Sequence, residues 1–558
     1  MLWYNIPDED DSFAKQAVTG KSAQVIDKYS WLKTPEKSNR AKTAKLHKTQ
    51  EKLMRDTFPI QRTIGDIDIA DIKIDVRSRD DIPLILLGLQ HIYCTDDVRE
   101  KVFEIIKDLL PTQRVEGQAK PVSADLGCPG MNQWTILVLG SLRLCLNADF
   151  DRIHELVNQH RTLRLMLGIA DGDEKTFSLQ TLKDNLRLFT PDILARINQV
   201  VVEAGYALLG KKNTPVPVAG RCDSFVVETD VHFPTDISLL YDAMRVLLHL
   251  CAHFSEAYNL KGWRQFKNGL KKLKKAVRIL QKLKHSTSKD ETKKQAKAEQ
   301  IVQAHQKFID LSAVQLKRVE DTIALLASQH PVGELQLAKP KAFIAHAKRQ
   351  IDQIERRVMK GEAIPHPEKV FSLFQPHTEW ISKGKAGVPV ELGLRVAVVE
   401  SREGFILHHT VMEKQTDDQI AVAIIKETQA QFPSFKACSF DKGFHSPANQ
   451  TGLKPLLDQV TLPKKGKLSA SDELRESSDV FVAARKAHSG VESAINALEV
   501  HGLDKCLDHG IDGFKRYAAL AVVSRNIQKI GQIKRDKERE RLARERERLQ
   551  QRQQKLTA

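Results

Sequence analysis

Paired cysteines are missing from the sequence. Its 558 residues include seven cysteines, which are scattered without a Cys-x-x-Cys pair. Several of them lie in apolar segments. Disulfide scaffolds and structural zinc sites both need cysteines at short, repeated spacings. We therefore expect the cysteines to be reduced core residues.

Long apolar runs are missing too. The longest, such as residues 136–146, are interrupted by Gly140, Ser141 and Arg143 and are too short to span a bilayer. The first eight residues have neither the basic start nor the apolar stretch of a secretory signal. We expect a cytoplasmic protein without a membrane partner.

Positive charge is in excess over the whole sequence. The chain has 87 Lys and Arg against 71 Asp and Glu, a formal net charge of +16 with a pI near 9.3. A surplus this large indicates a polyanionic partner, of which nucleic acid is the commonest. The chain is also too long for one core, so about two to four domains are expected.

The first part of the chain has the periodicity of helices. Residues 1–80 are polar, but apolar positions three and four apart recur in residues 98–109, 134–146, 150–167 and 181–205. Short turns join these segments. Residues 81–212 therefore predict either an ordinary helical bundle or a DNA-binding domain with a helix-turn-helix.

A basic helical segment follows over residues 241–365. Residues 261–294 contain thirteen Lys or Arg against one Asp and one Glu. Apolar residues recur there at intervals of four and three, which predicts a helical hairpin: Phe266, Leu270, Leu273, Val277, Leu280 and Leu283. Candidates for contacts with a DNA backbone are Lys271, Lys272, Lys274 and Lys275. A solvated outer face of the hairpin accounts for these lysines equally well.

Residues 213–240 and 366–530 carry the signals of β-strands. β-branched and aromatic residues predict strands over residues 221–233, 369–374, 390–401, 404–412, 435–441 and 460–463. Helices are expected over residues 416–432, 479–498 and 513–534. The charged tail, residues 531–558, continues the last of these and is expected to be a frayed or exposed helix.

One predicted strand ends on a carboxylate. Asp441 is followed at once by Lys442-Gly443 and then by His445-Ser446-Pro447, which are turn residues. In open α/β sheets, ligands and catalytic groups collect at the carboxyl ends of the strands. Asp441 is therefore either a catalytic candidate or a surface carboxylate that opens a turn.

The order of the elements predicts the fold. With the helical segment set aside, a strand with Asp223 precedes two further strands, a helix, the strand with Asp441 and a helix with Glu492. This is the order of an RNase H-like α/β core, interrupted here by a long helical insertion and preceded by an all-helical region. The first and fourth strands of such a sheet are neighbours. Asp223 and Asp441 are then expected side by side, with Glu492 on a helix above them.

Four motifs carry a resemblance. They are Cys-Asp-Ser-Phe-Val-Val-Glu at 222–228 with Pro-Thr-Asp at 234–236, Glu-Trp-Ile-Ser-Lys-Gly-Lys at 379–385, Asp-Lys-Gly-Phe at 441–444 and His-Ser-Gly-Val-Glu at 488–492. In this order they resemble bacterial insertion-sequence transposases of the DDE type, and more narrowly the insertion-sequence-4 group. The resemblance covers residues 125–530. It implies a DNA transposase whose acidic triad is Asp223, Asp441 and Glu492.

The resemblance also implies a cofactor and partners. Two Mg²⁺ or Mn²⁺ ions are expected, with Asp223 bridging both and Asp441 and Glu492 each holding one. One ion activates water and later the 3′-OH of DNA, while the other stabilises the leaving oxygen. Magnesium prefers oxygen ligands, which carboxylates supply. The substrate is double-stranded DNA, as element ends and as target, and synapsis of two ends implies a homodimer.

Three positions depart from the pattern of the family. Phe225 stands where Thr is common, His488 where Arg is expected and Glu499 where Lys is expected. Further DNA contacts are predicted at Lys383, Lys385, Lys464, Lys465 and, when protonated, His488, although a basic hairpin tip also explains the first two. Two alternative functions stay open. One is a catalytically degenerate, transposase-derived DNA-binding protein, and the other is an RNase H-like metal-dependent nuclease without strand transfer.

Overall fold

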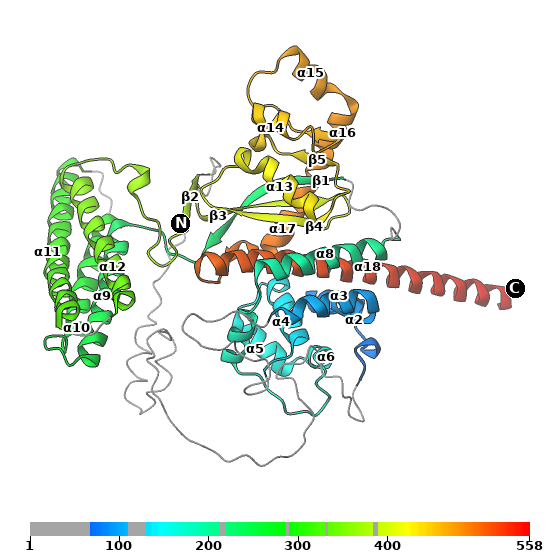
Figure 1. Ribbon diagram of the computed structural model, residues 1–558, viewed down its shortest axis with the longest axis horizontal. Helices are drawn as coiled ribbons and strands as arrows, with labels where there is room; N and C mark the ends of the chain where they lie inside the picture. The colour runs from blue at the N-terminus through cyan, green and yellow to red at the C-terminus, as the bar shows by residue number, and fades with distance from the viewer. Residues whose placement is uncertain are drawn as a thin grey trace. The chain divides into compact units, whose positions relative to one another are not determined.

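The computed structural model describes residues 67–109, 130–210, 219–285, 290–329, 333–382 and 389–557 (Figure 1). Most of the polar segment expected over residues 1–80 lies outside these ranges. The described chain combines many helices with one mixed sheet. The coarse prediction of a mixed α/β protein is therefore confirmed.

Seven strands form the sheet. They are β1 (Ala219–Thr229), β2 (Glu379–Ser382), β3 (Val390–Ser401), β4 (Ile406–Met412), β5 (Ala437–Phe440), β6 (Gln459–Thr461) and β7 (Lys505–Cys506). Across the sheet the order is β4, β3, β1, β5 and β6. β2 pairs with the start of β3, and β7 pairs with the end of β1. β3 is antiparallel to β1 and β4, while β5 runs parallel to both β1 and β6. The expected neighbours, the strands before Asp441 and around Asp223, are confirmed.

The strand predicted over residues 369–374 is wrong. This segment forms turns, because the Ser372 hydroxyl accepts hydrogen bonds from the backbone N–H groups of Phe374 and Gln375. Its apolar side chains serve packing instead: Leu373 is buried in a helical core, and the Phe371 ring lies 5.6 Å from that of Trp380. A short segment rich in apolar and aromatic residues therefore imitates a strand without joining the sheet.

Seven helices precede the sheet in the described part of the chain. They are α2 (Asp81–Cys94), α3 (Asp96–Lys107), α4 (Gln133–Cys145), α5 (Phe150–Gln159), α6 (Arg161–Met166), α7 (Leu179–Leu186) and α8 (Pro191–Leu208). Two predicted helices are each divided. His160 caps α6 by accepting from the Leu163 N–H, and Thr190 caps α8 with Pro191 in its first turn.

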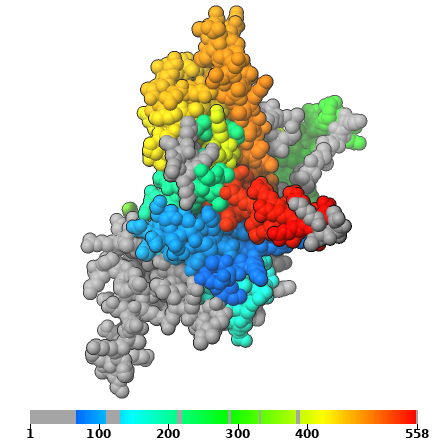
Figure 2. All heavy atoms as spheres, turned by 90° about the vertical axis from the view of Figure 1, so that its right-hand side faces the viewer, coloured from blue at the N-terminus to red at the C-terminus, as the bar shows by residue number. Residues whose placement is uncertain are grey.

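These helices and the sheet share one hydrophobic core with the long helix α18 (Gly510–Thr557). α18 packs against α2 so closely that a Cβ atom on Gly531 would lie 1.8 Å from the carbonyl oxygen of Leu84. Figure 2 shows this red helix against the blue N-terminal helices. Asn526 of α18 bonds to both Asn198 of α8 and Ile406 of β4. The core therefore ties the helical region directly to the sheet.

The insertion has a second core of its own. Its helices are α9 (Asp236–Ala257), α10 (Phe266–His285), α11 (Glu291–Gln329) and α12 (Glu334–Ile354). The predicted hairpin seam is confirmed where Leu273, Val277 and Leu280 are buried between α10 and its neighbours. α9 is long and apolar enough to cross a membrane, but its apolar residues form this core. Packing within the insertion therefore accounts for its apolar side chains.

The remaining helices follow β4 in the chain, and several of them contact β1, β5 or the turn Lys442–Phe444. They are α13 (Asp417–Gln431), α14 (Pro447–Gly452), α15 (Ala470–Ser477), α16 (Asp479–His488) and α17 (Gly490–Leu498). The helix expected over residues 479–498 is thus two helices that meet at Ser489. α18 continues through the charged tail, where its side chains from Arg539 to Gln554 are almost all exposed.

Candidate active site

Two of the predicted carboxylates lie on neighbouring parallel strands. Cys222 of β1 pairs with Phe440 of β5, so Asp223 and Asp441 occupy the next position on each strand. β5 ends at Phe440, and Asp441 begins the turn Lys442–Phe444, in which its side chain accepts from the Gly443 N–H at 3.2 Å. The parallel pairing therefore brings together two residues that are far apart in the sequence.

The third predicted carboxylate reaches the same region from a helix. Glu492 lies in the first turn of α17, and that helix contacts β1. The charges of Glu492 and Asp441 both act on Asp223. All three residues of the predicted triad thus belong to one electrostatic cluster.

Burial and negative charge perturb Asp223. Burial raises the pKa of its carboxyl, and the carboxylates of Asp441, Asp417 and Glu492 raise it further, to about 7. A hydrogen bond from the Ser224 N–H, at 2.7 Å, opposes this change only in part. Carboxylates collected in this way repel one another, and a bound cation relieves the repulsion.

The perturbed Asp223 predicts a pH-dependent stability of the metal-free protein. Because its folded-state pKa is raised, the contribution of Asp223 to stability is complete below about pH 4 and is lost as the pH rises through about 7. Asp223→Asn should therefore raise the thermal midpoint in EDTA at pH 8 by a few degrees, and the gain should shrink as the pH falls and vanish at about pH 4. Melting curves of both proteins across this range test it. An equal gain at both pH values would contradict the raised pKa.

The donors suit a hard divalent cation. Among the residues that the structure describes, no three His, Cys, Asp or Glu side chains already converge as a metal-binding group. Asp223, Asp441 and Glu492 nevertheless all offer carboxylate oxygens, the ligands that Mg²⁺ and Mn²⁺ prefer. The fit to a divalent cation therefore rests on the chemistry of the donors and on their shared negative charge.

His488 is held as a neutral group beside these carboxylates. Its Nδ1 lies 3.0 Å from the Ser439 hydroxyl, and its Nε2 is buried without a hydrogen-bond partner. Burial lowers the pKa of His488, although Asp441 and Glu492 act in the opposite direction. At neutral pH His488 is therefore a hydrogen-bonding group and not the cation that a phosphate contact by charge requires.

A cation that the sequence did not suggest lies close by. The Arg221 guanidinium pairs with Glu400 at 3.0 Å, and a Cβ atom on Gly490 would lie only 2.1 Å from Arg221 Nη1. Gly490 thus leaves the space that Arg221 occupies beside α17. Strand alternation could have identified Arg221 from the sequence, because residues 221 and 223 lie on the same face of one strand.

Asp417 is a second residue that the sequence did not single out. It lies in the first turn of α13, where a carboxylate is ordinarily explained by the helix dipole. Here the Ser224 hydroxyl donates to Asp417 Oδ1 at 2.6 Å, next to Asp223 in the chain. No local pattern reveals this contact, because it joins residues 193 positions apart.

No protein-family model, curated protein or solved structure matches the chain. A function is therefore argued from three features of the chain: the carboxylates, the strand order and the distribution of positive charge. Each of them belongs to residues whose placement is described above.

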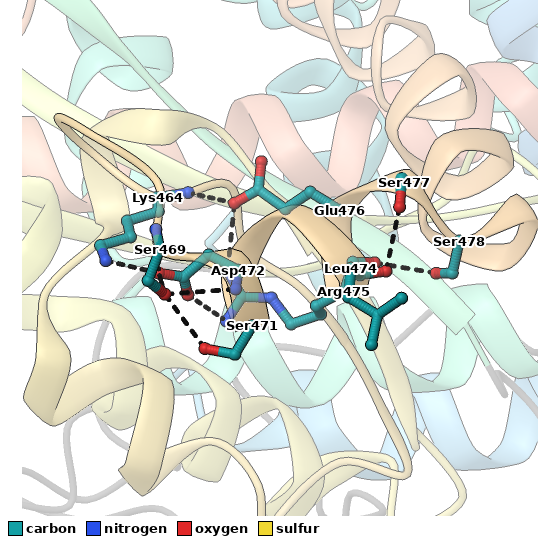
Figure 3. A network of polar contacts seen from close by, with 9 residues as sticks. All are labelled: Lys464, Ser469, Ser471, Asp472, Leu474, Arg475, Glu476, Ser477 and Ser478. Atoms are coloured by element: carbon teal, nitrogen blue, oxygen red, sulfur yellow. Dashed lines mark hydrogen bonds and ion pairs between the residues drawn. The ribbon is translucent and has the colours of Figure 1, made fainter.

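The predicted DNA-binding residues of the loop after β6 differ in their surroundings. Lys464 is engaged in an ion pair with Asp472, whose carboxylate also pairs with Arg475 (Figure 3). Glu476 accepts from the Lys464 backbone N–H and closes the network. Lys465 is exposed and donates to the carbonyl oxygen of Gly443 at 3.0 Å, directly beyond Asp441. Lys465 is therefore better placed than Lys464 to meet a phosphate near the carboxylates.

The other predicted lysines fall into two groups. Lys383 and Lys385 lie outside the described residues. On α10, Lys271, Lys272 and Lys275 are exposed, while Lys274 is half-buried. These lysines lie on a helix of the insertion, and none of them is among the charges that act on Asp223. Their contact with DNA stays a prediction.

Proposed function

We propose that the protein is a DNA transposase of the DDE type, which cleaves the ends of a mobile element and joins them to target DNA. The observation that carries the proposal is the parallel pairing of β1 and β5, which makes Asp223 and Asp441 neighbours within the electrostatic reach of Glu492. Perturbed carboxylates of this kind mark functional sites more often than structural ones.

The strand order supports an RNase H-like core for this activity. Three strands, β4, β3 and β1, are consecutive antiparallel neighbours, and β5 and β6 continue the sheet parallel to β1. The insertion enters after β1, as the motif order predicts. The motif series, the strand order and the positions of the three carboxylates are mutually consistent.

The chemistry follows from the charge of the reacting groups. Displacement at a phosphodiester develops negative charge on the attacking and leaving oxygens, and a divalent cation, when bound, supplies the compensating charge. Asp223, Asp441 and Glu492 would hold that cation. Arg221, which pairs with Glu400, lies beside Gly490 at the start of α17. Lys465 would meet the DNA backbone beside Asp441.

The function is tested with purified protein, DNA carrying the element ends, a target plasmid and Mg²⁺. Cleavage at the ends followed by joined products, both lost in EDTA, is the expected result. Binding without cleavage would favour the degenerate DNA-binding protein instead. Cleavage without joined products would favour the metal-dependent nuclease. A complex holding two element ends and two protein chains would agree with the expected homodimer.

The α10 lysines predict a salt-dependent affinity for DNA. Replacing Lys271, Lys272, Lys274 and Lys275 by Gln should reduce the slope of log K against log[salt] by about 0.9 for each lysine that contacts a phosphate. Filter binding between low and physiological salt measures the slope. Lys317→Gln and Lys348→Gln are matched controls, since these lysines of the insertion are paired with Asp321 and Glu320. A slope equal to that of wild type would make α10 a structural helix only.

A further inference from the structure

The Asp417 carboxylate is attached to the strand that carries Asp223. The Ser224 hydroxyl donates to Asp417 Oδ1 at 2.6 Å, and the Ser224 backbone N–H donates to Asp223 Oδ1 at 2.7 Å. Ser224 therefore donates to two carboxylates, to Asp223 through its backbone and to Asp417 through its side chain. Consecutive residues of a strand point to opposite faces, so Asp417 approaches β1 from the face opposite Asp223.

The same carboxylate abuts the turn that carries Asp441. A Cβ atom on Gly443 would lie 2.9 Å from Asp417 Oδ2 and 3.5 Å from Asp441 Oδ2. The two carboxylates thus approach one point of the turn, where a side chain larger than that of glycine would press on the Asp417 carboxylate. The backbone conformation does not itself call for glycine here, since Gly443 is not in the left-handed region.

A side-chain amide fixes the start of α13 to this turn. Asn449 Nδ2 donates to the carbonyl oxygen of Asp418 at 2.6 Å and to that of Phe444 at 2.8 Å, and Asn449 is buried. The first turn of α13 therefore cannot move away from the turn after β5 without breaking buried hydrogen bonds. Asp417 extends from this anchored turn to β1.

We infer that Asp417 is a positioning residue that sets the separation of Asp223 and Asp441. It acts through Ser224 on β1 and through its contact at Gly443 on the turn after β5. The inference rests on the proposed function, because it assigns the separation of two carboxylates that hold a divalent cation. The helix dipole of α13 stabilises the charge of Asp417 in this position.

The test measures the affinity of the full chain for Mn²⁺ by electron paramagnetic resonance, without DNA. Ser224→Ala and Asp417→Ala should each weaken binding about tenfold, as removal of groups that orient metal ligands does. The double variant should be no weaker than either single variant, because both remove one interaction. Asp417→Asn should recover most of the loss, since its amide oxygen still accepts from Ser224. Melting curves in EDTA confirm that each variant is folded.

Two results would overturn the inference about Asp417, and a third would overturn the proposed function. If Asp417→Asn is as weak as Asp417→Ala while Ser224→Ala binds normally, Asp417 contacts the ion directly through its charge. If both alanine variants bind normally, Asp417 has no role in the site. Asp441→Asn is the reference variant: normal Mn²⁺ binding by it would overturn the proposed function itself, independently of Asp417.

Discussion

Asp441→Asn should abolish metal-dependent cleavage of DNA while leaving the fold intact. The substitution keeps the shape of the side chain and its acceptor for the Gly443 N–H, but removes the charge that a cation requires. A loss of roughly 10³-fold or more is expected, equivalent to about 4 kcal/mol of transition-state stabilisation. Asp441 is exposed at the end of β5, so the loss should come without a fall in thermal midpoint.

The matched control is Asp458→Asn. Asp458 is an exposed carboxylate directly before β6. Like Asp441 it adjoins a strand, but its charge is not among those that act on Asp223. Its variant should cleave at the wild-type rate. Single-turnover cleavage of labelled element ends with Mg²⁺ measures both. Equal rates for Asp441→Asn and wild type would remove Asp441 from the site.

Asp508→Ala should destabilise the protein by about 3–5 kcal/mol. Asp508 lies just before α18 and pairs at 2.9 Å with Arg143 of α4 and with Arg516 of α18. The Arg143 and Asp508 side chains are only 4% and 10% exposed. Removal of the carboxylate leaves a buried guanidinium without its counter-ion, at the point where the N-terminal helices meet α18. Urea unfolding of both proteins measures the difference.

The effect of this variant should depend on pH. Burial alone would raise the pKa of Asp508, but the ion pairs with Arg143 and Arg516 outweigh it and hold the pKa below the usual range. The contribution of Asp508 is therefore present above about pH 4 and is lost as the pH falls through its folded-state pKa. Asp171→Ala, which breaks an exposed pair with Arg161, should change stability little at any pH. A small effect of Asp508→Ala at pH 7 would contradict the buried ion pairs.

Asp223 and Asp441 were predictable as candidates because strand and turn signals are local. The turn after Asp441 and the β-branched strand around Asp223 are both visible in the sequence, and β1 and β5 pair as the element order predicts. The helices α3, α4 and α13 likewise follow the predicted periodicity with shifts of one or two residues at their ends.

The residues around these carboxylates were not predictable in the same way. Arg221 and Asp417 gain their surroundings only when α17 and α13 pack beside β1, so no local pattern marks them. Nor did the sequence show that α18 joins the N-terminal helices and the sheet into one core, since an apolar helix has the same period whatever it packs against. The false strand over residues 369–374 has a different cause, because the Ser372 hydroxyl accepts from N–H groups two and three residues further on and so favours a local turn over a strand.

The position of Mn²⁺ in crystals of the protein, located by anomalous scattering, tests the proposed site most directly. We predict density beside Asp223 in the middle of β1 and at the carboxyl end of β5, with oxygen atoms of Asp223 and Asp441 as ligands and Glu492 of α17 facing it. The same density should be lost in crystals of Asp441→Asn. Mn²⁺ bound elsewhere in wild-type crystals, with none between Asp223 and Asp441, would contradict a carboxylate metal site at this edge of the sheet.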